Sequence, residues 1–210
     1  MDNKKKKLKK KAPIIVSKKK KLKKRKPIKF FIMTYTANVP FAKKTQKVLK
    51  DTYGINSEIV VGEKISKEVK FNHILYHNFY KYLLPKMLEY GGRCYYLEDD
   101  VRFTSNPLEN IPTGIDVYWS VYRKGGKKPT KYVVGSQAIL FNNKALKLLE
   151  TQTKFRKAHI DGFFTKFLNY EEGRGNLKWE TAIPKIGYEQ EHDSLITTDP
   201  KQRKKFEKPN

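Results

Sequence analysis

The chain has 210 residues, a net charge of +25 and a single cysteine, Cys94. This length suits one α/β domain of medium size with tails, and a lone cysteine excludes an intramolecular disulfide and is compatible with a reducing compartment. No apolar run approaches the roughly 18 residues of a membrane-spanning helix, and the early apolar run 12–16 is too short for a signal-peptide core. The sequence therefore predicts a cytoplasmic or nuclear protein without a transmembrane segment.

The positive charge is concentrated at the two ends of the chain. Residues 1–28 contain 15 Lys and Arg and one acidic residue, and residues 200–210 contain five and one. Like charges at this density cannot bury a core, so we expect a disordered lysine-rich tail over 1–27, a folded domain over 28–199 and a basic tail over 200–210. The first tail is compatible with a nuclear import signal, contact with nucleic acid, contact with an anionic lipid surface, or a solubilising role.

The first half of the domain alternates strands with helices. The pattern predicts strands over 28–36 and 57–61, a helix over 40–52, and helical structure over 66–90 that Pro85 kinks or divides and Gly91-Gly92 ends. A strand over 94–97 follows, and its cysteine reads as a small packed hydrophobe.

The second half continues the alternation. We expect a strand over 116–122, a strand over 131–141 with a bulge or close backbone approach at Gly135, a helix over 144–150 capped by Asn143, a helix over 159–169 and a last strand region over 177–189. Trp119 and Trp179 are expected in the core. Together the elements predict an α/β sandwich around a mostly parallel sheet.

Three carboxylates follow the apolar strand 94–97 directly, as Glu98-Asp99-Asp100. Strand formers predict burial, whereas unpaired buried charge is costly. The conflict is resolved if the strand ends at a cleft where the carboxylates meet Mg²⁺ or Mn²⁺, ions that take oxygen ligands and often share them with substrate phosphates. The alternative is an ordinary strand end followed by an acidic turn.

Four segments in order resemble glycosyltransferase family 25, which includes lipopolysaccharide and collagen-type glycosyltransferases. They are Leu97–Val101 (LEDDV), Gly135–Phe141 (GSQAILF), His159–Phe164 (HIDGFF) and Gln190–Ile196 (QEHDSLI). The resemblance spans about residues 28–196 and implies a GT-A fold, a nucleotide-diphosphate sugar donor, most simply a UDP-sugar, a divalent metal and inversion at the transferred sugar. The lysine-rich ends and compact domain look like a large-DNA-virus or phage version, which would act in a host cell.

The resemblance also implies roles for individual residues. Asp100 becomes the main metal ligand, Glu98 a second ligand or ribose contact, and Asp99 a sugar or ribose contact or a residue that holds the loop, on the expectation that alternate residues share a face. His192 becomes a further metal ligand, with an exposed loop histidine as the alternative. Asp161 becomes the general base, with a helix N-cap as the alternative.

At the opening strand the chain departs from the family. Thr34, Tyr35 and Thr36 take the place of an arginine-containing donor loop, and we expect them at the donor. The acceptor is a glycan, a protein or a nucleic acid. A nucleic-acid-binding protein without catalysis is the rival interpretation, and it depends mainly on the basic tails.

Overall fold

The computed structural model describes residues 26–63, 74–122, 124–125, 133–152, 160–182 and 186–189. Both lysine-rich tails lie almost wholly outside these ranges, as do His192 and the segment 190–196. In the described part of the chain, no helix is both long and apolar enough to cross a membrane.

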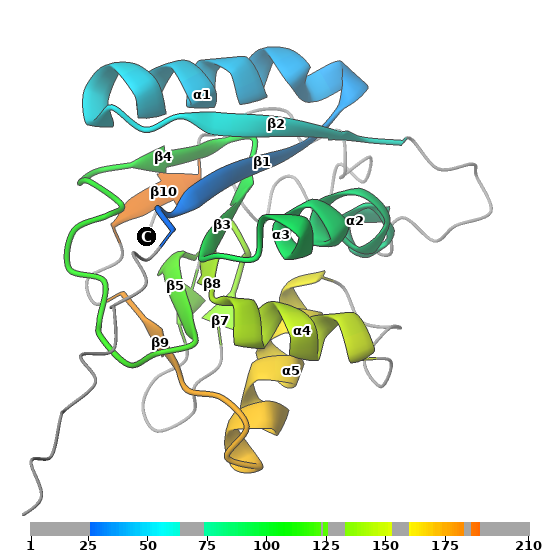
Figure 1. Cartoon of the computed structure of the whole chain (residues 1–210). Coiled ribbons are helices and arrows are strands. Elements are labelled where there is room, and N and C mark those ends of the chain that lie inside the picture. Colours follow the sequence, from blue (N-terminus) through cyan, green and yellow to red (C-terminus); the bar gives the residue numbers. More distant parts are fainter. Residues whose placement is uncertain are drawn as a thin grey trace, which may run out of the picture.

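Strands and helices alternate along the chain, as the hydrophobic pattern predicts (Figure 1). The helical elements are η1 (Thr36–Asn38), α1 (Val39–Tyr53), α2 (Ile74–Asn78), the π-helical turn η3 (Phe79–Leu83), α3 (Leu84–Tyr90), α4 (Asn143–Thr151) and α5 (Ile160–Gly173). The strands are β1 (Lys29–Tyr35), β2 (Ser57–Gly62), β3 (Cys94–Glu98), β4 (Val101–Phe103), β5 (Val117–Val121), β6 (Lys124–Gly125), β7 (Val133–Val134), β8 (Ala138–Phe141), β9 (Trp179–Thr181) and β10 (Gly187–Glu189).

The central sheet has the strand order β2-β1-β3-β8-β5-β9 among the described residues. β1 pairs in parallel with both β2 and β3, with Ile32 opposite Ile59 on one side and Leu97 on the other. β5 and β9 are also parallel, whereas β8 runs antiparallel to β3 and β5. The prediction of an α/β fold around a mostly parallel sheet is confirmed, with β8 as the reversed strand.

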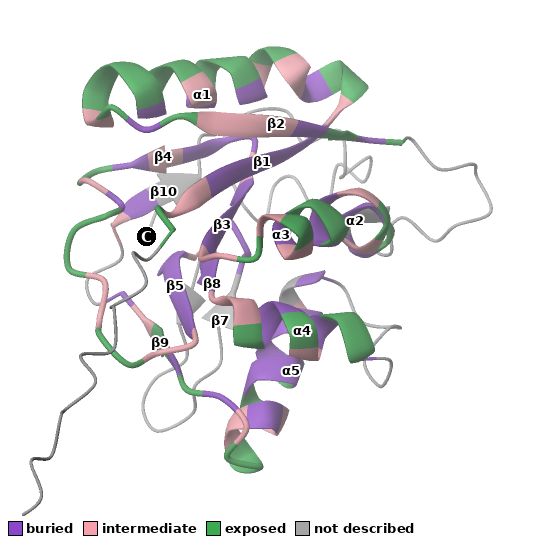
Figure 2. Cartoon of the chain, in the orientation of Figure 1, coloured by how far each residue is buried: buried purple, intermediate pink, exposed green. Residues whose placement is uncertain are grey.

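Helices cover both faces of this sheet, which is why β1 and β3 are apolar at nearly every position (Figures 1 and 2). Phe30 and Ile32 face a core that includes Ala42 and Leu49 of α1. Alternate residues of the same strand, such as Phe31, face a second core formed with the helices α2 to α5. The strand interior is therefore fixed on both sides, and only its ends are available for chemistry.

The aromatic residues and the cysteine belong to these cores. Trp119 and Trp179 are buried, as predicted, and the Trp119 indole donates a hydrogen bond of 3.0 Å to the backbone oxygen of Gly135. Cys94 is also buried, and burial raises the pKa of its thiol to about 12. It packs as a small hydrophobe.

Pro85 and the paired glycines act as predicted on the long helical segment. A π-helical turn separates α2 from α3, and Pro85 occupies the first turn of α3, where its missing N–H costs nothing. Gly91 takes a left-handed conformation, φ 65°, and ends the helix with a bond to the backbone oxygen of Met87.

Two local expectations are wrong. The side chain of Asn142, not Asn143, caps α4 by accepting a 2.9 Å bond from the Ala145 N–H. The expected strand 131–141 is divided into β7 and β8, because Gly135 adopts φ 88° and breaks the extended backbone. The structure also adds the short strand β4, which directly follows the acidic residues and pairs with β10.

Candidate functional site

The three carboxylates stand at the carboxyl end of β3, in the middle of the sheet. Glu98 is the last residue of β3, and residues 99 and 100 form a turn that leads into β4. Because β1 and β3 are parallel, their carboxyl ends meet at the same edge, which brings Tyr35 and Thr36 to the side of the turn where Glu98 ends its strand. This edge of an open α/β sheet is where such folds place ligands. We call residues 98–100 the acidic turn.

Asp99 is held from two sides by threonine hydroxyls. Its side chain is 8% exposed, and Oδ2 accepts a 2.6 Å hydrogen bond from Oγ1 of Thr34, at the end of β1. Its backbone oxygen accepts a 2.5 Å bond from Oγ1 of Thr45 in α1. Asp99 therefore fastens the acidic turn to the neighbouring strand and helix, which is the loop-holding alternative expected for it.

Glu98 is oriented by the segment that precedes β8. Its Oε1 accepts a 2.5 Å bond from Ser136 Oγ and a longer one, 3.4 Å, from the Tyr96 hydroxyl. Its backbone N–H donates to the backbone oxygen of Gln137 at 2.9 Å. The Glu98 side chain is only half-buried, so its carboxylate is positioned and still reaches the surface.

Asp100 lies beyond the strand and is 5% exposed. The expectation that Glu98 and Asp100 share a face used the alternation of an extended chain, and that premise fails because residues 99 and 100 form a turn. The turn, together with the Thr34 and Thr45 bonds to Asp99, sets where Asp100 stands. Its burial at a sheet edge rich in carboxylates keeps it a candidate ligand for a cation.

Tyr35 ends β1 beside the acidic turn. Burial raises the pKa of its hydroxyl well above the ordinary value, and the negative charges of Glu98 and Asp99 raise it further. Tyr35 is therefore a neutral hydroxyl close to two carboxylates. Thr36, the next residue, is exposed.

Two expected site residues cannot be placed through their side chains. Asp161 is the second residue of α5, a helix that packs against β7 next to the Gly135 segment, and only its backbone is described. His192 lies outside the described residues. Asp161 thus belongs to a helix that contacts β7, and its role stays a prediction.

The described residues contain no group of three or more His, Cys, Asp or Glu side chains arranged to hold a metal ion. Glu98 and Asp100 nevertheless offer carboxylate oxygens, the donors that Mg²⁺ and Mn²⁺ prefer, and a site completed by substrate phosphates needs only one or two of them. The donor set of the acidic turn therefore fits a divalent cation that is shared with a phosphorylated ligand.

Sequence reasoning missed the residues that hold the acidic turn. Thr45 lies in no motif, and Ser136 lies in the segment Gly135–Phe141 but was given no role of its own. Thr34 was expected at the donor, whereas it is 1% exposed and bonded to Asp99. One signal was present in the sequence. Gly135 predicted an irregular backbone, and that irregularity directly precedes Ser136.

No protein-family model matches this chain, and no curated protein matches it in sequence. Solved structures do resemble it. The catalytic domain of Drosophila β1,4-galactosyltransferase 7, in complex with xylobiose, superposes with a TM-score of 0.51 at 10% identity and covers 82% of this chain and 74% of its own. The chain folds like a GT-A glycosyltransferase.

Two further structures are similar at lower scores. A glycosyltransferase involved in the glycosylation of the major capsid of PBCV-1 gives a TM-score of 0.49 at 10% identity, over 85% of this chain and 98% of its own. A variant of the Drosophila enzyme in complex with manganese, UDP-Gal and xylobiose gives 0.47 at 10% identity, over 87% and 81%. The likeness to the Drosophila catalytic domain at a TM-score of 0.51 confirms the GT-A fold expected from the sequence and does not single out family 25.

Proposed function

We propose that this protein is a metal-dependent glycosyltransferase that moves a sugar from a nucleotide-diphosphate donor to a hydroxyl acceptor. The observation that carries the proposal is the acidic turn: carboxylates fixed at the carboxyl end of the central strand β3, in a fold shared with a galactosyltransferase. Carboxylates gathered at one sheet edge repel one another and are costly to bury, so their arrangement favours a bound cation.

The donor side is formed by the end of β1 and the acidic turn. Asp100 and Glu98 would hold Mn²⁺ or Mg²⁺, and the ion, when bound, neutralises the negative charge that develops on the departing diphosphate. Thr34 and Thr45 hold Asp99, and through it they fix the backbone from which Asp100 extends. Ser136 orients Glu98 by the 2.5 Å bond. These contacts within the protein fix the carboxylates in place, which is the preorganisation that charge stabilisation requires.

Thr36 and Tyr35 are proposed at the donor nucleotide or sugar, since Thr36 is exposed and Tyr35 ends β1 beside the acidic turn. His192 is proposed as a further metal ligand. A UDP-sugar donor, and a place close to glycosyltransferase family 25, follow from the four sequence segments that resemble that family.

The acceptor side is proposed at the start of α5. Asp161 would take the proton of the acceptor hydroxyl as its oxygen attacks the anomeric carbon and the bond to the diphosphate breaks, which inverts the configuration at that carbon. Asp161 belongs to α5, which contacts β7, the strand that precedes Gly135 and the Glu98 partner Ser136. The Drosophila catalytic domain is in complex with xylobiose, a disaccharide, which supports a glycan acceptor here.

A donor screen tests the donor side. The purified chain is incubated with UDP- and GDP-sugars and Mn²⁺, and released nucleoside diphosphate is measured. Asp100→Asn should lower turnover by at least about a hundredfold, whereas Glu150→Gln, which removes the same charge from the exposed end of α4, should leave it unchanged. Equal activity in the two variants contradicts the metal role of Asp100. Circular dichroism confirms that the Asp100 variant is folded.

Asp161→Asn tests the acceptor side separately. A general base contributes about 10² to 10⁴ in rate, so transfer should fall by that factor while thermal stabilisation by UDP and Mn²⁺ is retained. Loss of that stabilisation instead would move Asp161 to the donor site.

A further inference from the structure

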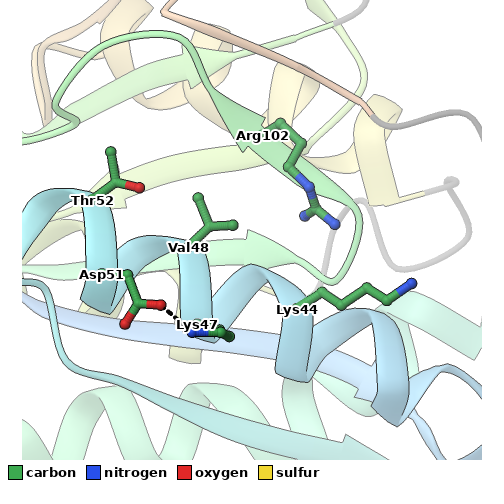
Figure 3. Close-up of a pocket in the computed structure, with 6 residues that line it drawn as sticks. All are labelled: Lys44, Lys47, Val48, Asp51, Thr52 and Arg102. Atoms are coloured by element: carbon green, nitrogen blue, oxygen red, sulfur yellow. Dashed lines mark hydrogen bonds and ion pairs between the residues drawn. The ribbon is translucent and has the colours of Figure 1, made fainter.

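A basic groove lies between α1 and β4 (Figure 3). Its volume is about 420 Å³, within the range of ligand pockets. Six residues line it: Lys44, Lys47, Val48, Asp51, Thr52 and Arg102. Three of them are cationic, and the one carboxylate, Asp51, is already paired with Lys47. The groove therefore presents an excess of positive charge.

The helix on one side of the groove, α1, adds further positive charge. α1 carries four lysines and one aspartate, and the lysines Lys43, Lys44, Lys47 and Lys50 are all exposed. Arg102 reaches from β4 toward the helix on the side where Lys44 extends (Figure 3). Cations from two elements thus face one hollow, an arrangement that favours a ligand with repeated negative charges.

The groove is connected to the acidic turn by hydrogen bonds. Arg102 donates to the Thr45 hydroxyl and, at 2.8 Å, to the backbone oxygen of Val101. Thr45 in turn donates to the backbone oxygen of Asp99. The groove therefore borders the acidic turn, because Arg102 follows Asp100 by two residues.

The lining also discriminates among polymers. Among the described residues that line the groove none is aromatic, so they provide no stacking surface of the kind on which single-stranded nucleic acids and neutral sugars depend. The lysine-rich segment 1–28 of the chain itself is excluded by like charge. These features favour a ligand that is recognised through its anionic groups. Its hydroxyl groups can form hydrogen bonds with Thr52, and its carbon skeleton can contact the aliphatic side chain of Val48.

We propose that the groove between α1 and β4 binds an acidic glycan, one whose sugars carry carboxylate or sulfate groups, and that this glycan is the acceptor. The binding step stands on the groove alone, whereas the acceptor role rests on the proposed glycosyl transfer. Lys44, Lys47 and Arg102 pair with successive anionic groups, and the end of the glycan extends toward the acidic turn.

Binding to the full chain tests the proposal without donor or metal. Titration calorimetry compares three probes of equal length: hexagalacturonate, uncharged maltohexaose and a single-stranded thymidine hexanucleotide. The double variant Lys44→Gln, Lys47→Gln is compared with Lys147→Gln, Lys166→Gln, which removes the same charge from exposed positions on α4 and α5. General attraction by the lysine-rich tails is the same in both variants.

Hexagalacturonate should bind more tightly than maltohexaose, and the groove variant should weaken it roughly three- to thirtyfold, against less than about twofold for the control. An equal loss in both variants overturns the proposal, as does maltohexaose that binds equally well. A larger loss for the hexanucleotide than for hexagalacturonate assigns the groove to nucleic acid instead.

Failure of the transferase function gives a different result. Thermal stabilisation of the wild-type chain by UDP and Mn²⁺ reports on the donor site alone. If this stabilisation is absent while the groove variant still binds hexagalacturonate more weakly than the wild type, the glycan-binding site is supported and the acceptor role is refuted.

Discussion

Removal of the Thr34 hydroxyl should destabilise the protein and loosen the acidic turn. Thr34 is 1% exposed and Asp99 is 8% exposed, and their 2.6 Å bond joins the end of β1 to the turn after β3, 65 residues later in the chain. A hydrogen bond to a charged group contributes about 1.5–3 kcal/mol, and a carboxylate left buried without it carries a further desolvation cost. Thr34→Val should therefore lower the free energy of unfolding by at least about 1.5 kcal/mol.

Urea denaturation measures this change. In thermal denaturation, a loss of about 1.5–3 kcal/mol in a chain of this size corresponds to a fall in Tm of roughly 3–12 °C. Thr36→Val is the matched control, because Thr36 is exposed near the same strand end and should change stability by less than about 0.5 kcal/mol.

A double-mutant cycle with Asp99→Asn isolates the interaction. If the bond is what holds the turn, the two single effects are not additive, and the coupling energy reaches about 1 kcal/mol or more. A loss at Thr34 no larger than at Thr36, or additive effects in the cycle, would refute the reasoning that Asp99 fastens the turn through this hydroxyl.

Three further outcomes follow from single residues. Because burial raises the pKa of Cys94 to about 12, its thiol should resist iodoacetamide at pH 8 until urea unfolds the chain, and fast labelling of the native protein contradicts this. The hydrogen bond from Lys86, with support from Lys29, lowers the pKa of Glu58. Its stabilisation is therefore present above the ordinary carboxyl pKa and is lost as the pH falls through the folded value. Glu58→Gln should therefore reduce the loss of unfolding free energy between neutral and acidic pH by at most about 1 kcal/mol. If the urea midpoint depends on pH in the same way in the variant and the wild type, the ion pair does not contribute. Gly135→Ala should lower the free energy of unfolding by about 1–2 kcal/mol because φ is 88°, while Gly173→Ala, at the last residue of α5 where φ is not positive, should not lower it in urea denaturation. Equal effects of the two glycine changes would show that Gly135 bears no strain.

The sequence alone determined the elements whose cause is local. The apolar run from Phe30 to Met33 is buried on both faces and could only be an interior strand of a covered sheet. Pro85 and Gly91 marked where α3 begins and ends, because their backbone restrictions do not depend on distant residues. The position of Glu98-Asp99-Asp100 directly after the apolar strand likewise gave the location of the candidate site.

Only the tertiary structure decided how the site is held together. Thr34, Thr45 and Ser136 reach the acidic turn from three different elements, and their bonds join residues 65, 54 and 38 positions apart. The basic groove also depends on tertiary structure, since Arg102 of β4 and the lysines of α1 are brought together only when β4 lies next to the helix in the folded chain. Local pattern fixes strands, caps and the direction of side chains within an element, because those depend on neighbouring residues. Contacts between distant elements depend on the register and packing of the whole sheet, and no short stretch of sequence contains them.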